Sequence, residues 1–242
     1  MTLPKSTDPL DGAVVAFDLD GTLVETAPDL MGALNGVLVE QGLSALPAEG
    51  ARHLIGRGAK ALLVRGFEAS GRTLDEDAAS PLVARFIEIY FDRIAQDSYP
   101  YPGCIAALDG LRDRGARLVV CTNKLTYLSK ELLHRLDLSF RFEAIIGADA
   151  APAPKPDPRH VLHAVQAAGG TANRAVMVGD SINDVASAQA AGVPAIVFPF
   201  GYSDVPAADL GAERLIHHYD DLIATVESLL QRSAASVIAS PL

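Results

Sequence analysis

Tryptophan is absent from this chain of 242 residues, and only 6% of the residues are aromatic. Proteins that bind single-stranded nucleic acid stack the bases on aromatic rings, which are scarce here. Positive charge is scarce as well, because 20 Lys and Arg stand against 30 Asp and Glu, for a formal net charge of −10 at pH 7. Both features argue against a nucleic-acid partner or an anionic membrane surface. A small anionic substrate stays compatible, since a metal ion and a few cations can dominate one pocket.

Cysteines and long apolar runs are also few. The two cysteines, Cys104 and Cys121, are too few for a disulfide framework and indicate buried thiols in a reducing compartment. No segment approaches the roughly 20 apolar residues of a membrane-spanning helix. The opening MTLPKSTDPLDG also contains no apolar run of signal-peptide length. We therefore expect a cytoplasmic protein with no membrane partner.

Short apolar runs are present and indicate buried strands. They lie at 13–17, 117–121, 144–146, 175–178 and 195–198. Helical stretches separate the later runs, at about 125–136, 158–168 and 182–191. Alternation of strand and helix predicts an α/β fold, here a Rossmann-like, doubly wound parallel sheet with helices on both faces.

The stretch from about Ala27 to Pro100 has few strand signals. Apolar residues such as Leu30, Leu34 and Leu38 recur in it at helical spacing. This pattern predicts a helical unit inserted after the first strand. We accordingly divide the chain into a core, residues 1–25 and 101–242, and an α-helical cap domain, residues 26–100.

Polar residues follow three of the apolar runs at the point where each run ends. Asp18, Thr122 and Asp180 occupy these positions. Ligands of open parallel sheets bind at the carboxyl ends of the strands, so we expect these three residues to meet at one edge.

The first of these positions opens the sequence Asp18-Leu19-Asp20-Gly21-Thr22. Two carboxylates so close together repel each other, and a divalent cation beside them relieves the repulsion. A carboxylate is ionised at neutral pH, so Asp18 needs no base to attack phosphorus and form an aspartyl-phosphate. A second carboxyl group can protonate the leaving oxygen and later accept a proton from water.

Four segments, in order along the chain, resemble the motifs of the haloacid-dehalogenase-like superfamily of phosphohydrolases. They are FDLDGTLVETAPD from residue 17, VCTNK from 120, KPDP from 155 and VGDSIND from 178. The resemblance implies a Mg²⁺-dependent phosphatase in which Asp18 is the nucleophile and Asp20 the acid and base. It implies that Lys155 contacts both the phosphate and Asp18, and that Thr122 binds the phosphate. Lys124 receives no assignment from it.

The same resemblance implies the ligands of the metal and of the phosphate. Mg²⁺ would be bound by the carboxylates of Asp18 and Asp180 and by the backbone carbonyl of Asp20. We expect Asp184, about one helical turn after Asp180, to orient the site without ligating the metal. The backbone N–H groups of Leu19, Asp20 and Asn123 would contribute to the phosphate cradle.

Within the predicted cap, Arg57 and Gly58 stand in Ile55-Gly56-Arg57-Gly58-Ala59-Lys60, just before an apolar helix at 61–67. Backbone N–H groups at the start of a helix bind anions, and Arg57 could bind a carboxylate. The segment resembles the cap of the bacterial phosphoglycolate phosphatase branch, which implies 2-phosphoglycolate or a similar small phosphorylated metabolite as the substrate. Arg57 departs from that branch, where a small or amide residue is common.

Three alternatives remain open from the sequence. A sugar-phosphate phosphatase or a phosphoglucomutase-like enzyme of the same superfamily would use the same core residues. A non-catalytic phosphate-binding module would also fit the fold. The dehalogenase branch is disfavoured, because carbon–halogen displacement does not need the acid that Asp20 supplies. The oligomeric state is not readable from the sequence.

Overall fold

The computed structural model describes residues 8–47, 54–55 and 58–238. Its main sheet is six-stranded and parallel, with the strand order β5-β4-β1-β6-β7-β8. The strands are β1 (Val14–Phe17), β4 (Arg117–Cys121), β5 (Ala144–Ile146), β6 (Ala175–Gly179), β7 (Ala195–Val197) and β8 (Arg214–Leu215). The first five coincide with the predicted apolar runs, so the α/β fold predicted from the sequence is confirmed.

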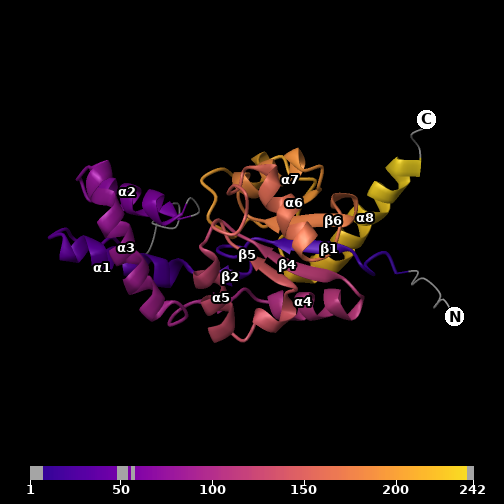
Figure 1. Cartoon of the computed structure of the whole chain (residues 1–242), viewed down its shortest axis with the longest axis horizontal. Coiled ribbons are helices and arrows are strands. Elements are labelled where there is room, and N and C mark those ends of the chain that lie inside the picture. The colour runs from indigo at the N-terminus through magenta and orange to yellow at the C-terminus, as the bar shows by residue number, and fades with distance from the viewer. Residues whose placement is uncertain (1–7, 48–53, 56–57, 239–242) are drawn as a thin grey trace.

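Helices cover both faces of the sheet, as Figure 1 shows. Side chains of β1 alternate between two apolar clusters, because successive residues of a strand point to opposite faces. Val14 and Ala16 join the cluster formed with α6 (Pro158–Ala167) and α7 (Ile182–Ala190). Val15 and Phe17 join the larger cluster formed with α4 (Cys104–Asp113), α5 (Thr126–Arg135) and α8 (Leu222–Ile238). Burial on both faces explains why β1 is continuously apolar.

The segment between β1 and β4 forms a separate helical unit, which Figure 1 shows beside the sheet. It consists of α1 (Ala27–Glu40), α2 (Ala59–Ala69) and α3 (Glu76–Arg93), packed on one another through side chains such as Leu34, Leu63 and Phe86. The chain leaves and re-enters the sheet through a two-stranded antiparallel ribbon of β2 (Val24–Glu25) and β3 (Tyr99–Pro100). The predicted domain limits of 1–25, 26–100 and 101–242 stay a prediction.

Two helices were not predicted from the sequence. Helix α4 follows β3, and α8 closes the described part of the chain. The segment 233–242, whose state the sequence left open, is helical as far as Ile238, and its last four residues lie outside the described ranges. Both cysteines are buried free thiols, as predicted. Among the described helices, none combines the length and apolar character needed to cross a membrane.

Candidate active site

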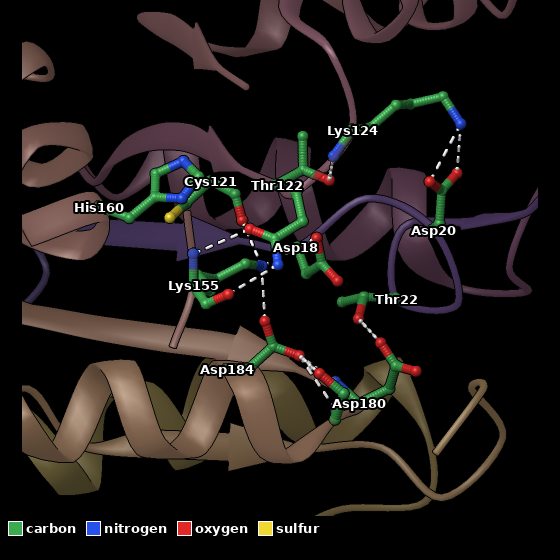
Figure 2. Close-up of polar contacts among 12 residues, drawn as sticks. Asp18, Asp20, Thr22, Cys121, Thr122, Lys124, Lys155, His160, Asp180 and Asp184 are labelled. Atoms are coloured by element: carbon green, nitrogen blue, oxygen red, sulfur yellow. Dashed lines mark hydrogen bonds and ion pairs between the residues drawn. The ribbon is translucent and has the colours of Figure 1, made fainter. Parts of the chain in front are cut away.

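The carboxyl edge of the central strands gathers the polar residues that the apolar runs predicted. Asp18 follows β1, Thr122 follows β4 and Asp180 follows β6. Strands β4 and β6 both pair with β1, so the three residues stand at neighbouring strand ends. Figure 2 shows Asp18 at the centre of this group, between Lys155 and Asp184 on one side and Asp20 on the other. The chain order of the strands reverses at β1, which is where open α/β sheets bind ligands.

Lys155 supplies a buried positive charge at this edge. Its Nζ atom lies 3.0 Å from Asp18 Oδ1 and 2.6 Å from Asp184 Oδ1, and it donates a hydrogen bond to the Cys121 carbonyl at 2.6 Å. Burial opposes the charge on Lys155, but the two carboxylates outweigh it and raise the pKa of the ammonium group. The side chain is only 1% exposed, so these carboxylates replace the water that would otherwise solvate it.

The Asn123 side chain holds the backbone of Lys155 in place. Asn123 Nδ2 donates to the Lys155 carbonyl, and the Lys155 N–H donates to Asn123 Oδ1, both at 2.9 Å. Sequence reasoning assigned Asn123 a backbone role only and missed this paired contact. Because β4 and the loop before α6 are joined by it, Lys155 is positioned by the strand end that carries Thr122.

Asp184 uses both carboxylate oxygens inside the protein. Its Oδ1 binds Lys155, while its Oδ2 accepts hydrogen bonds from the Asp180 N–H at 3.2 Å, the Ser181 N–H at 3.0 Å and the Ser181 hydroxyl at 2.7 Å. With Ser181 it forms the capping box that starts α7. A Cβ atom at Gly179 would collide with this carboxylate, so the close packing requires a glycine there. Asp184 therefore fixes the turn that carries Asp180.

Both carboxylate oxygens of Asp180 also accept hydrogen bonds. Its Oδ1 accepts a hydrogen bond from the Thr22 hydroxyl at 2.8 Å, and its Oδ2 accepts one from the Tyr202 N–H at 2.6 Å. Thr22 belongs to the first motif, and its contact joins that loop to the end of β6. Burial, followed by repulsion from Asp184 and Asp18, raises the pKa of Asp180 well above its usual value.

Carboxylate oxygens of Asp18, Asp180 and Asp184 lie within 4.8 Å of one another. Burial also raises the pKa of Asp18 to about 6, against the opposing effect of Lys155 and with repulsion from Asp184 adding to it. Burial and mutual repulsion disfavour the ionised form of these carboxyl groups. A hard divalent cation would neutralise their charge, and such a cation prefers oxygen ligands. Asp18 and Asp180 stand at the ends of β1 and β6, whereas Asp184 lies on α7, pairs with Lys155 and closes the α7 turn.

Asp20 lies apart from this cluster and has a different partner. Lys124 Nζ contacts its two carboxylate oxygens at 2.9 and 3.0 Å. The ammonium group also lies 4.4 Å from the centre of the Tyr90 ring, which belongs to α3 of the helical unit. Burial opposes the charge of Lys124, but Asp20 and Tyr90 outweigh it and raise its pKa. The sequence motifs gave Lys124 no role, and only its position next to Thr122 and Asn123 hinted at one.

A cavity of about 100 Å³ lies between the strand ends and the helical unit. The strand ends line it with Asp18, Asp20, Thr122, Asn123 and Lys124, and the helical unit lines it with apolar side chains such as Leu30, Leu62 and Phe86. Gly58 also lines the cavity, at the start of α2. Leu19 is fully buried in the core, and Arg57 lies outside the described residues.

Comparison with known proteins identifies the family. A family model described as haloacid dehalogenase-like hydrolase matches residues 13–192. The chain belongs to the haloacid dehalogenase-like hydrolases.

Relatives match this hydrolase over nearly their whole length. A Caulobacter vibrioides protein named phosphoglycolate phosphatase is 54% identical over 91% of this chain and 93% of its own length. An Agrobacterium fabrum protein of the same name is 42% identical over 91% of this chain and 95% of its own length. A crystal structure of a predicted phosphoglycolate phosphatase from Haemophilus somnus superposes with a TM-score of 0.82 at 27% identity, covering 88% of this chain and 97% of that one.

Tyr202 connects the cluster of this haloacid dehalogenase-like hydrolase to the ribbon that leads into the helical unit. While its N–H binds Asp180, its hydroxyl accepts hydrogen bonds from the N–H groups of Thr26 at 2.7 Å and Ala27 at 2.9 Å. The hydroxyl in turn donates to Glu25 Oε1 at 2.7 Å. These contacts join positions about 176 residues apart, so no local sequence pattern could have revealed them.

Removing the Tyr202 hydroxyl is expected to loosen this junction. In Tyr202→Phe, two buried N–H groups and the Glu25 carboxylate lose a partner, which should lower the free energy of unfolding by about 2 kcal/mol. Urea denaturation measures the change. Tyr99→Phe, at an exposed position of β3, is the matched control and should stay within about 0.5 kcal/mol of the parent protein. Equal stability of the two variants would contradict the role given to Tyr202.

Proposed function

We propose that this chain is a Mg²⁺-dependent phosphatase that hydrolyses 2-phosphoglycolate to glycolate and phosphate. The observation that carries the chemistry is the position of Asp18, whose carboxylate lies 3.0 Å from the Lys155 ammonium and within the acidic cluster. The names and the high identity of the relatives support the choice of substrate. The chain is a phosphoric monoester hydrolase.

Asp18 attacks the phosphorus atom of the ester. Its oxygen forms a bond to phosphorus while the bond from phosphorus to the glycolate oxygen breaks, which leaves an aspartyl-phosphate. Asp20 gives a proton to the departing oxygen, so glycolate leaves as an alcohol. Asp20 then takes a proton from the water that attacks the aspartyl-phosphate, and phosphate is released with Asp18 restored.

Charge on the transferred group is balanced by groups that are already in place. Lys155 lies beside Asp18 and carries one of the positive charges. The Thr122 hydroxyl and the backbone N–H groups of Leu19, Asp20 and Asn123 are suited to bind the phosphate oxygens. Such donors stabilise a phosphoryl transition state without reorganising during the reaction.

Mg²⁺ fits the acidic cluster. The carboxylates of Asp18 and Asp180 and the backbone carbonyl of Asp20 would hold it. When bound, the ion neutralises charge on the phosphoryl oxygens and on the surrounding carboxylates. Asp184 orients the turn and Lys155 without being needed as a ligand.

Added Mg²⁺ is expected to stabilise the fold more at about pH 7.5 than at about pH 5. The pKa of Asp18 rises from 3.8 to about 6 on folding, mainly through burial. Between these values Asp18 binds more protons in the folded, metal-free chain than in the unfolded chain, so its contribution to stability falls as the pH rises. Asp18 and Asp180, holding Mg²⁺, would stay ionised at the higher pH, which would offset the loss. Thermal melting with and without Mg²⁺ measures the difference, and an equal gain at both pH values would contradict the metal assignment.

The helical unit of residues 26–100 is proposed to act as a cap that excludes water from the cavity. Its apolar side chains supply the wall opposite the strand ends. Exclusion of water strengthens the electrostatic interactions on which phosphoryl transfer depends. A small phosphorylated metabolite is the partner this cavity suits, and the two buried free thiols support a cytoplasmic location.

A panel of phosphate esters tests the proposed function. The purified chain should release phosphate from 2-phosphoglycolate faster than from sugar phosphates or nucleotides, and only with Mg²⁺ present. Product analysis separates phosphatase from mutase chemistry, because a mutase would return an isomeric ester in place of free phosphate. No phosphate release from any ester with Mg²⁺ would overturn the proposal, and preference for a sugar phosphate would overturn its choice of substrate.

A further inference from the structure

We propose that Lys124 and Tyr90 form a subsite that binds the second anionic group of the substrate, the carboxylate of 2-phosphoglycolate. This inference rests on the proposed function, because it concerns the part of the substrate that is not transferred. The phosphoryl group has its own set of donors at the strand ends, so the carboxylate needs a separate partner.

The charge of the cavity makes such a partner necessary. Asp18 and Asp20 both line the cavity and would repel an incoming carboxylate. Within the described ranges, the one cationic side chain that lines this cavity is Lys124. Its side chain is 5% exposed, so its charge acts on the cavity with little screening by water.

Lys124 is placed where the substrate carboxylate must lie. As acid and base, Asp20 has to reach the ester oxygen, and a single CH₂ group separates that oxygen from the carboxylate of 2-phosphoglycolate. Lys124 contacts both carboxylate oxygens of Asp20, at 2.9 and 3.0 Å. Its ammonium group therefore lies near the place that the substrate carboxylate reaches when the ester oxygen is beside Asp20. An ammonium group has three donors, and the contacts to Asp20 use two of them.

Tyr90 provides a second indication of a ligand. It lines the same cavity and is 1% exposed, and its buried hydroxyl donates to no acceptor among the residues described, although the Lys124 ammonium acts on it. Burial raises the pKa of this hydroxyl, which therefore remains a donor at neutral pH. A buried hydroxyl without an acceptor costs free energy, and an oxygen of the substrate would supply that acceptor.

The two residues come from different parts of the fold. Lys124 follows β4 in the sheet, and Tyr90 lies on α3 of the helical unit, with the ammonium group 4.4 Å from the ring centre. A carboxylate bound by both would connect the helical unit to the strand ends. Substrates without a second anion would lack this connection, so the subsite would select for anionic leaving groups.

A matched pair of substrates tests the subsite. 2-Phosphoglycolamide has the shape of 2-phosphoglycolate but carries a neutral amide in place of the carboxylate. The quantity measured is the ratio of kcat/KM for the acid to kcat/KM for the amide. In Lys124→Met this ratio should fall about 100-fold, because the buried carboxylate loses its charged partner. The substitution could also slow both esters equally, by disturbing Asp20 or by weakening the fold. Such a shared loss of rate cancels in the ratio.

Two further variants sharpen the result. Tyr90→Phe should lower the ratio about 10-fold, mainly through KM, because one hydrogen bond to a charged group is lost. Lys124→Arg should retain most of the selectivity, since it keeps the charge. Lys130→Met, at an exposed position of α5, serves as the control and should leave the ratio unchanged.

The outcomes separate this inference from the proposed function. A parent protein that releases no phosphate from 2-phosphoglycolate overturns the proposed function and the subsite with it. A parent protein that does release it, combined with a ratio in Lys124→Met within about 3-fold of the parent value, overturns the subsite alone.

Discussion

Replacing Asp18 by asparagine is expected to lower phosphate release from 2-phosphoglycolate by at least about 10⁴-fold. The amide keeps the shape of the side chain but cannot attack phosphorus. Folding should survive, because Lys155 keeps its 2.6 Å contact with Asp184 and one member of a crowded set of carboxylates becomes neutral. Steady-state assays on the variant and the parent protein give the rate, and thermal melting checks the fold.

The control for this variant is Asp113→Asn, which changes an exposed acid at the end of α4. It should retain the parent rate. If Asp18→Asn kept more than about a tenth of the activity while folded, another group would be the nucleophile and the mechanism would be wrong.

Replacing Lys155 by methionine should produce the largest loss of stability. The Lys155 and Asp184 side chains are each 1% exposed, and Asp18 lies 3.0 Å from the same ammonium group. Without the lysine, these buried carboxylates face each other with no compensating charge, a change that typically costs about 3–5 kcal/mol. For a chain of this length the melting temperature should fall by about 10 °C. Phosphate release should be almost lost as well.

A second substitution tests whether the unpaired carboxylate charges cause the loss of stability in Lys155→Met. Lys155→Met combined with Asp184→Asn should recover part of the lost stability, because one of the unpaired carboxylates is neutralised. Lys130→Met is again the matched control and should stay within about 0.5 kcal/mol of the parent protein. A Lys155→Met protein as stable as that control would show that the buried ion pairs are not needed by the fold.

The apolar runs predicted the strand ends well, because β1, β4 and β6 are buried on both faces and their polar residues begin where burial ends. The sequence alone was therefore enough to place Asp18, Thr122 and Asp180 at one edge of the sheet. The pairing of Lys155 with Asp184 could not be derived in this way. These residues are 29 positions apart, and the contact depends on how the loop before α6 meets the start of α7.

The contacts missed by sequence reasoning are those made across large separations by residues to which the sequence assigned no role. Lys124 meets Asp20 over 104 positions. The hydroxyl of Tyr202 meets Thr26 over 176. A lysine or tyrosine viewed locally has many possible partners, and only the packing of the ribbon and the helical unit against the sheet selects one. The roles given to all these residues stay predictions until they are measured.

The central claim is that phosphate passes through a covalent bond to Asp18. Rapid acid quenching of the chain with 2-phosphoglycolate labelled on phosphorus, followed by peptide mapping, tests it most directly. We expect label on the peptide that contains Asp18, appearing and decaying at least as fast as the enzyme turns over, and absent from Asp18→Asn. Turnover without label on the protein at any time, or with label on another residue, would contradict it.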